Sequence, residues 1–364
     1  MKILKLNEWL KLFKVKDISF REFLKVAKIK NSNNDFLRLK ITDNDTRRLL
    51  YNAFVKNINQ YLTNFYNTSL KIPDDLDLNN LKVLTMSNTR NKNKKNLVRN
   101  LYYKELLLLT QTDLRNVRPF LEVLLDLTNK LIIDYKLVTP SGLKHIQNNN
   151  LSNILSAYYF RSSIMNPAIP FILSTKYLKG SRVFTPTLGW SSYLYGFLSN
   201  ENVMEYVGTD VIPKVCQTSR QLAKKLFPSK STIIYQSPSE DLLKQSSFKR
   251  KYRNYFDVVF FSPPYYKLEI YPGKNQSVKR YNNYELWLEK YWQATVQLCS
   301  YVIKPTGKMC YILSGYHKYE NLNEDMNKIV LKYFKSNRKY TLLNTKFFNS
   351  NSEKIYIFSP KPTN

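Results

Sequence analysis

Cysteine and histidine are scarce in this chain of 364 residues, which contains 3 cysteines and 2 histidines. Cys216, Cys299 and Cys310 lie far apart, in no spacing that holds a metal ion, and His145 and His317 cannot complete a zinc cluster. The composition therefore excludes a zinc centre and fits a reducing, intracellular location.

Long apolar runs are also missing from the sequence. The first segment, MKILKLNEWLKLFKVKD, alternates apolar and basic residues at helical spacing. It lacks the uninterrupted apolar stretch that a signal peptide or a membrane span needs. We therefore expect a helix here, no membrane association, and a cytoplasmic or nuclear location.

Acidic residues are few compared with basic ones. The chain has 27 Asp and Glu against 57 Lys and Arg, which gives a net charge of +30 spread over both halves. Such an excess favours polyanionic partners, and nucleic acid is the natural one. The alternative is compositional, because an A/T-rich coding sequence inflates lysine without any function.

The pattern of apolar residues predicts two domains. In residues 1–157 they recur every three or four positions, as at Phe120, Val123 and Leu124, which indicates a mainly helical domain. A basic loop is expected at residues 87–96. After Gly180, short apolar runs alternate with helical stretches, which predicts an α/β domain over residues 158–364 with a mostly parallel sheet.

The α/β domain should contain seven strands. They are expected at Arg182–Thr185, Glu205–Thr209, Thr232–Tyr235, Asp257–Phe261, Lys308–Leu313, Thr341–Phe348 and Lys354–Phe358. Helices are expected at Trp190–Leu198, Pro213–Leu226, Tyr284–Val302 and Asn323–Phe334. The last two strands are joined by a short polar connection, which predicts a terminal antiparallel hairpin.

The tetrapeptide Ser262-Pro263-Pro264-Tyr265 directly follows a buried strand, where ligands of open α/β sheets bind. An exocyclic amine on a base is a poor nucleophile, because its lone pair is delocalised into the ring. The Ser262 side chain and the Pro263 carbonyl could accept the two amino protons and recover that lone pair. Tyr265 could stack on a flipped base. The alternative is a rigid proline turn at a strand end.

The sequence SPPY resembles motif IV of S-adenosylmethionine-dependent amino-methyltransferases, which read Asp, Asn or Ser, then Pro-Pro and an aromatic residue. The longer run FFSPPYYKLEIY is similar to phage and viral DNA methyltransferases. The resemblance implies a Rossmann-like methyltransferase fold, S-adenosyl-L-methionine as cofactor and a viral or mobile-element source. The serine form is familiar among N4-cytosine enzymes, whereas Asp and Asn dominate N6-adenine enzymes.

The segment VFTPTLGWSSYLYGFLS resembles motif I of the same family. Gly189 would let the backbone approach the methionine moiety of the cofactor, and Trp190 would form a wall of the pocket. Thr185 stands where the family has Asp, and Ser191 and Ser192 stand where it has two glycines. Serine can replace glycine where φ is negative, so we expect these two positions to have negative φ.

Five more residues are assigned to the cofactor site by position. Asp210 ends the second strand and would accept hydrogen bonds from ribose hydroxyls, although an Asp here could instead cap the next helix. By resemblance, Gln236 and Ser237 would lie near the adenine ring, as in motif III. Asn166 and Phe171 fall in a motif X-like run and would close the pocket; helix entry and core packing are their alternative roles.

Together these motifs predict methylation of an exocyclic amino group, cytosine N4 or adenine N6, in DNA rather than RNA. Few residues follow the motifs, so target recognition is expected from the helical N-terminal half or from a protein partner. The loop after Tyr265, with Lys267, Lys274, Lys279 and Arg280 among tyrosines, suits phosphate contact or a lid over the cofactor. The changed motif I leaves a second hypothesis, a catalytically degenerate relative that binds nucleic acid.

Overall fold

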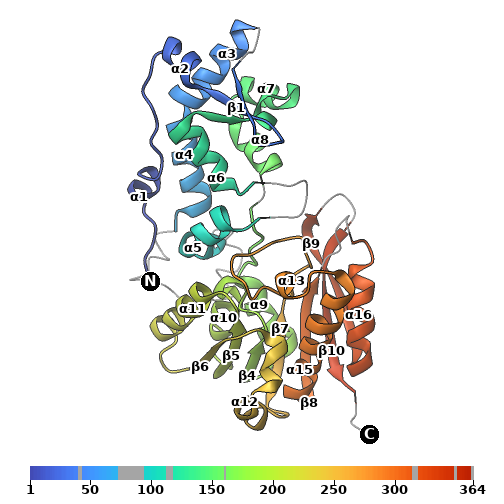
Figure 1. Cartoon of the computed structure of the whole chain (residues 1–364). Coiled ribbons are helices and arrows are strands. Elements are labelled where there is room, and N and C mark those ends of the chain that lie inside the picture. Colours follow the sequence, from blue (N-terminus) through green and yellow to red (C-terminus); the bar gives the residue numbers. More distant parts are fainter. Residues whose placement is uncertain are drawn as a thin grey trace. The chain divides into compact units, whose positions relative to one another are not determined.

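The computed structural model describes residues 1–39, 43–72, 94–111, 118–159, 161–313, 319–347 and 351–361 (Figure 1). The chain divides into two compact units. One consists of Lys2–Pro73 and Arg99–Ser163, and most of the other is Ile164–Asn364. The domain boundary predicted from sequence lay at 157/158, six residues before the division at Ser163.

The N-terminal part of the chain is mostly helical. Its helical segments are α1 (Leu6–Leu10), α2 (Phe20–Val26), α3 (Asn44–Tyr51), η1 (Asn52–Lys56), α4 (Ile58–Phe65), η2 (Tyr66–Leu70), α5 (Lys94–Leu101), η5 (Glu105–Leu109), α6 (Phe120–Leu125), η6 (Asp126–Lys130), η7 (Tyr135–Val138), α7 (Pro140–Gln147) and α8 (Leu151–Tyr158). Of the predicted basic loop, residues 87–93 lie outside the described residues, and residues 94–96 begin α5.

This part also contains a small sheet that the apolar pattern did not predict. Its order is β2 (Phe36–Arg38), β1 (Lys28–Lys30) and β3 (Ile132–Asp134), with β1 antiparallel to β2 and parallel to β3. Strands of three residues are too short to show a period of two, and β3 joins from more than one hundred residues away.

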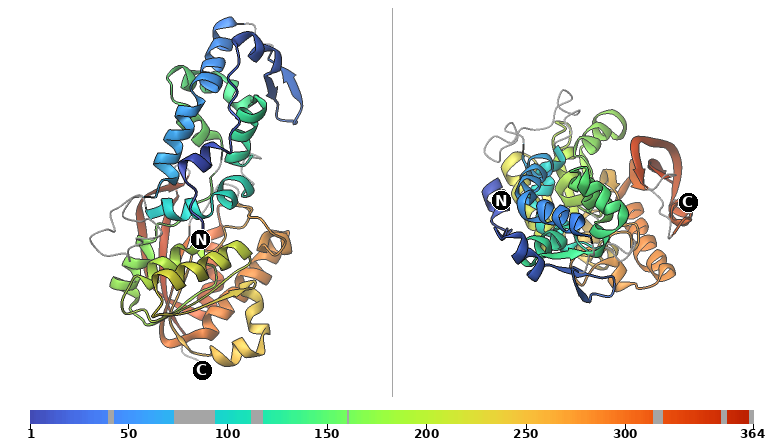
Figure 2. Two further views of the ribbon diagram at one scale, coloured as in Figure 1. Left: turned by 90° about the vertical axis from the view of Figure 1, so that its left-hand side faces the viewer. Right: turned by 90° about the horizontal axis from the view of Figure 1, so that it is seen from above.

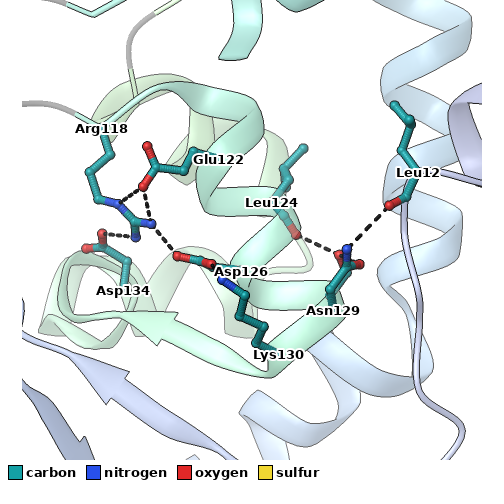
Figure 3. A network of polar contacts seen from close by, with 9 residues as sticks. Leu12, Arg118, Glu122, Leu124, Asp126, Asn129, Lys130 and Asp134 are labelled. Atoms are coloured by element: carbon teal, nitrogen blue, oxygen red, sulfur yellow. Dashed lines mark hydrogen bonds and ion pairs between the residues drawn. The ribbon is translucent and has the colours of Figure 1, made fainter. Parts of the chain in front are cut away.

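A buried arginine holds the helical unit together (Figure 3). Arg118, whose side chain is 16% exposed, pairs with Glu122 at 2.7 Å, with Asp126, and with Asp134 at 3.5 Å. Lys130 adds a second cation on Asp126 at 3.0 Å. Burial acts to raise the pKa of Asp126, but Lys130 and Arg118 outweigh it and lower that pKa overall. The network joins α6, η6 and β3.

Asn100 anchors the start of the chain to the same unit. Its Oδ1 accepts a hydrogen bond from the Leu4 N–H at 2.8 Å, and its Nδ2 donates to the Leu4 carbonyl at 2.8 Å and the Leu70 carbonyl at 2.9 Å. The side chain is 1% exposed. One buried amide therefore satisfies three buried main-chain groups.

The second unit is built on a seven-stranded sheet with the order β6-β5-β4-β7-β8-β10-β9. The strands are β4 (Arg182–Thr185), β5 (Glu205–Asp210), β6 (Ser231–Gln236), β7 (Phe256–Phe261), β8 (Ile303–Leu313), β9 (Phe334–Phe347) and β10 (Asn351–Pro360). Strands β4 to β8 pair in parallel, and β10 is antiparallel to both β8 and β9. The predicted Rossmann-like methyltransferase sheet with its terminal hairpin is confirmed. The expected last residue of the sixth strand, Phe348, lies outside the described residues.

Helices flank the sheet on both sides (Figure 2). One packed group contains α9 (Ala168–Leu173), α10 (Ser192–Leu198) and α11 (Pro213–Leu226). The other contains η10 (Ser239–Lys244), α12 (Ser246–Lys251), η11 (Trp287–Gln293), α15 (Ala294–Val302) and α16 (Leu322–Tyr333). The expected helix over 284–302 consists of α14 (Tyr284–Leu286), η11 and α15. No described helix is long and apolar enough to cross a membrane.

Asp257 fixes β4 beside β7 at the centre of the sheet. Its carboxylate accepts hydrogen bonds from the N–H groups of Ser181 at 3.0 Å and Arg182 at 2.9 Å, and it pairs with Lys304. Gly180 leaves space for the Asp257 side chain, since a Cβ on residue 180 would lie 2.6 Å from the Cβ of Asp257. The clamp lies at the amino ends of β4 and β7 and holds the two strands side by side, whereas the site loops follow their carboxyl ends.

Candidate functional site

The predicted site residues gather along the carboxyl edge of the parallel strands. Thr185 ends β4, Asp210 ends β5, Gln236 ends β6, and Ser262 follows β7. Successive crossovers run outward in opposite directions from β4, because β5 lies on one side of it and β7 on the other. This switch point is where open α/β sheets bind ligands.

The loop after β4 has an unusual backbone. Gly189, Trp190 and Ser191 have φ values of 49°, 56° and 65°, so three consecutive residues are left-handed. The expected negative φ is found at Ser192, at −63°, but is wrong for Ser191. A side chain at left-handed φ costs about 1–2 kcal/mol. The Ser191 Oγ bonds the Ser219 Oγ on α11 at 2.7 Å, which helps to hold this conformation.

Tyr193 fills the space beside Gly189. A Cβ on Gly189 would lie 2.2 Å from the Cζ of Tyr193, so no side chain fits there. The Tyr193 hydroxyl accepts from the Ser262 N–H at 3.1 Å and donates to the Ser262 carbonyl at 3.4 Å. This ring therefore joins the loops after β4 and β7. Sequence reasoning missed it, although its place four residues after a loop glycine is a usable signal.

Thr185 is completely buried, and its hydroxyl bonds the Tyr206 Oη at 2.6 Å. Burial raises the pKa of Tyr206. Both groups are neutral and face each other between β4 and β5. Thr185 therefore does not present an acid to the carboxyl edge as the family's Asp would.

Asp210 presents a carboxylate at this edge. Its Oδ2 accepts from the Leu188 N–H at 3.2 Å, and its Oδ1 accepts from the Ile212 N–H at 3.0 Å. Burial raises the pKa of Asp210, and these N–H donors oppose the rise. The cap of α11 is Ile212, without a side-chain cap bond, so Asp210 is not its capping residue. Each carboxylate oxygen retains capacity for another donor.

Ser237 lies beside Asp210, and Gln236 is exposed at the end of β6. The Ser237 N–H donates to the Asp210 carbonyl at 3.1 Å, and the Ser237 carbonyl accepts from the Thr209 hydroxyl at 2.6 Å. These contacts connect the ends of β5 and β6.

Asn166 and Phe171 are seen in helix-entry and core positions. The Asn166 Oδ1 accepts from the Ala168 N–H at 3.1 Å at the start of α9, and Phe171 is 5% exposed. Gly196 on α10 faces them, since a Cβ there would lie 3.1 Å from the Phe171 nitrogen. The described contacts of these two residues join α9 to α10.

The hydroxyls of the SPPY segment form a directed chain. Tyr265 Oη donates to the Ile312 carbonyl at 3.3 Å and lies 3.2 Å from the Ser262 Oγ. Either hydroxyl can be the donor of the 3.2 Å contact, and when Tyr265 donates to the Ile312 carbonyl, Ser262 donates to Tyr265. The lone pairs of the Ser262 Oγ are then available as acceptors. The Pro263 carbonyl also accepts no hydrogen bond from the described part of the chain.

The loop after Tyr265 packs on two other site loops. Tyr271 donates to the buried Glu269 and packs edge-on against Trp190 with ring centroids 5.7 Å apart. Burial, followed by the nearby Glu269, raises the pKa of Tyr271. Arg280 pairs with Glu240 of η10 at 2.6 Å, so this cation is already used inside the protein. Sequence reasoning missed these contacts, which match the lid alternative for the loop.

Two of the loop's cations remain at the surface. Lys274 and Lys279 are exposed. Within the described ranges, no three His, Cys, Asp or Glu side chains come together as a metal site.

No family model and no curated protein matches the sequence. Similar solved structures include the N-methyltransferase NodS from Bradyrhizobium japonicum WM9 with S-adenosyl-L-homocysteine, at 9% identity and TM-score 0.38 over 53% of this chain and 84% of that one. TrmN from Thermus thermophilus has 10% identity and TM-score 0.38 over 54% and 49%. An rRNA methylase from Streptococcus thermophilus has 12% identity and TM-score 0.34 over 55% and 99%. Because these TM-scores are low, the functional argument rests on the site.

Proposed function

We propose that this chain binds S-adenosyl-L-methionine and methylates an exocyclic amino group, cytosine N4 or adenine N6, in DNA. The observation that carries the proposal is the pair of acceptors after β7. The Ser262 Oγ can accept when its proton is directed to Tyr265, and the Pro263 carbonyl is without a donor among the described residues. Both follow the strand next to the switch point, where a ligand is expected.

The residues present fit the adenosine half of this cofactor better than its methionine half. Asp210 can accept from the ribose hydroxyls, and Ser237 and Gln236 stand at the neighbouring strand end. At the other half, Gly189 and Trp190 supply the loop, but Thr185 offers no acid because its hydroxyl bonds Tyr206. When bound, the cofactor supplies an electrophilic methyl group.

The chain's own residues prepare the amine. Hydrogen bonds from the amino group to the Ser262 Oγ and the Pro263 carbonyl would draw its lone pair out of the ring. As the nitrogen formed its bond to the methyl carbon, the carbon–sulfur bond of the cofactor would break to leave S-adenosylhomocysteine, and the nitrogen would lose one proton to water. Tyr265 is fixed through its hydroxyl on β8, so its half-buried ring is positioned for a base taken out of a helix.

Nucleic acid is the proposed substrate because of the charge of +30 and the exposed lysines of the loop after Tyr265. We assign target recognition to the helical unit or to a protein partner. DNA is favoured over RNA by the resemblance of the SPPY run to phage and viral enzymes.

A second candidate is an inactive methyltransferase-like protein that binds nucleic acid. Three observations favour it. The Thr185 hydroxyl is hydrogen-bonded to Tyr206, the Tyr193 ring lies against Gly189, and Ser191 has a left-handed backbone conformation. Each one changes the methionine half of the site. The intact acceptor pair after β7 favours the enzyme.

Calorimetric titration of the full chain with S-adenosylmethionine separates the two candidates. The enzyme should bind with micromolar affinity, and Asp210→Ala should remove binding. Transfer of a labelled methyl group to DNA and to RNA, with nucleosides identified by mass spectrometry, then identifies the base. Ser262→Ala should keep cofactor affinity and lower the transfer rate about 10–100-fold. A folded chain that binds nucleic acid but does not bind the cofactor would establish the second candidate.

A further inference from the structure

Tyr291 carries a buried hydroxyl that no part of the described chain satisfies. The side chain is 4% exposed, and its Oη has no hydrogen-bond partner. The ring is held by Trp287, with centroids 5.1 Å apart. A buried donor without an acceptor costs free energy, so a phenylalanine would serve packing better here. The hydroxyl therefore has a proton to donate to a partner that binds to the protein.

The position of Tyr291 points to that partner. Thr295 lies one turn further along the same helical segment, on the same side. Its Oγ1 bonds the Oγ of Ser239 at 3.0 Å, and both residues are buried. Ser239 begins η10 two residues after Ser237, and η10 packs against η11, which carries Tyr291. This side of the helix thus faces the segment that follows β6.

Electrostatics agree with this placement. Burial raises the pKa of Tyr291 well above its ordinary value, and the carboxylates of Glu240 and Asp210 add to the rise. The hydroxyl therefore stays protonated at neutral pH and can act as a donor. Asp210 is the proposed acceptor for the ribose, so the field that acts on Tyr291 comes in part from the cofactor site.

We propose that the Tyr291 hydroxyl donates a hydrogen bond to the adenosine half of S-adenosylmethionine, an inference that rests on the proposed function. The ribose oxygens and the adenine ring nitrogens can supply the hydrogen-bond acceptor that the buried Tyr291 hydroxyl lacks among the described residues. The assignment to this half follows from Ser239, Ser237 and Asp210, which all lie on the β5–β6 side of the switch point.

The test is calorimetric titration of the full chain and of Tyr291→Phe with S-adenosylmethionine and S-adenosylhomocysteine, together with thermal unfolding. Because the two ligands share the adenosine half, Tyr291→Phe should weaken both about tenfold. Its melting temperature without ligand should stay the same or rise by up to about 3 °C, since an unpaired hydroxyl is removed.

Tyr255→Phe is the matched control. The Tyr255 hydroxyl bonds Glu205 at 2.7 Å at the opposite, amino end of β5, so its loss should leave both affinities unchanged. Equal affinities for Tyr291→Phe and wild type would overturn the inference and leave the proposed function standing. A marked fall in the melting temperature of Tyr291→Phe would also overturn it, because the hydroxyl would then have a partner in the chain. If the wild type binds neither ligand, the proposed function fails and the inference fails with it.

Discussion

The hydrogen bond between Ser191 and Ser219 predicts that Ser191→Gly reverses the effect of Ser219→Ala on stability. Ser191→Gly relieves left-handed strain of about 1–2 kcal/mol but adds about 0.5–1 kcal/mol of chain entropy to the unfolded state. It also leaves the fully buried Ser219 hydroxyl without its partner, at a cost of about 1–3 kcal/mol. The single variant should therefore lie between about 0.5 kcal/mol above wild-type stability and about 3 kcal/mol below it.

Ser219→Ala should then act in opposite directions in the two backgrounds. In the wild type it breaks the bond at 2.7 Å and should cost about 1 kcal/mol. In Ser191→Gly it removes an unpaired hydroxyl and should restore about 1–2 kcal/mol. The double variant should thus be more stable than the Ser191→Gly single variant, although it has lost one more polar atom.

Urea unfolding followed by tryptophan fluorescence measures all four proteins. Of the 4 tryptophans, only Trp9 belongs to the helical unit, so the signal reports mainly on the unit that contains the loop. If Ser219→Ala destabilises both backgrounds equally, the two hydroxyls are not coupled, and the account of this loop is refuted.

Three further predictions concern polar contacts that hold each unit together. Asp257→Asn should destabilise the sheet unit by about 1–2 kcal/mol at pH 7. Burial acts to raise the pKa of Asp257, but Lys304 and two N–H donors lower it overall. The ionised form therefore stabilises the fold above the ordinary carboxyl pKa of 3.8, and the difference in stability should shrink as the pH falls below that value. Asn100→Leu should cost about 2–4 kcal/mol in the helical unit, because it leaves the Leu4 N–H and the Leu70 carbonyl unpaired while the Leu4 carbonyl keeps Tyr66, and faster hydrogen exchange in α5 would show it. Arg118→Met should cost about 3 kcal/mol, because the buried Asp134 loses its cation and Asp126 keeps only Lys130, and unchanged exchange around α6 would contradict this.

The sheet could be predicted because its strands are short apolar runs and its helices are amphipathic. The run at β7 is buried on both faces, and such a run needs no long-range information to be recognised. The small sheet β2-β1-β3 could not be predicted in the same way. Its strands have three residues each, and what makes them strands is pairing with a distant segment.

The site was predicted at the level of positions and not of conformation. The strand ends identify Asp210 and Ser262, because the sequence gives each an apolar strand before it. The left-handed φ of Ser191 cannot be read from a serine, since serine is found in many conformations. Tyr193 and Tyr291 were missed for another reason: tyrosines on amphipathic helices are indistinguishable until tertiary contacts show which hydroxyls lack partners.

The acceptor pair after β7 also offers a reason why a serine could serve where many of the amino-methyltransferases that the SPPY segment resembles have an acid. An acid would accept protons through its charge, which requires ionisation in a partly buried site. Here the direction of each hydroxyl is set by neutral groups, with Tyr265 on the Ile312 carbonyl and Tyr193 on the main chain of Ser262. A neutral acceptor is weaker than a carboxylate, but this arrangement costs no reorganisation when the amine arrives. It follows that ionisation of the SPPY segment should contribute no acidic limb to the pH dependence of methyl transfer. The affinity for the cofactor, in contrast, should fall as Asp210 becomes protonated. Because burial raises the pKa of that carboxylate, its protonation occurs closer to neutral pH than for an ordinary Asp.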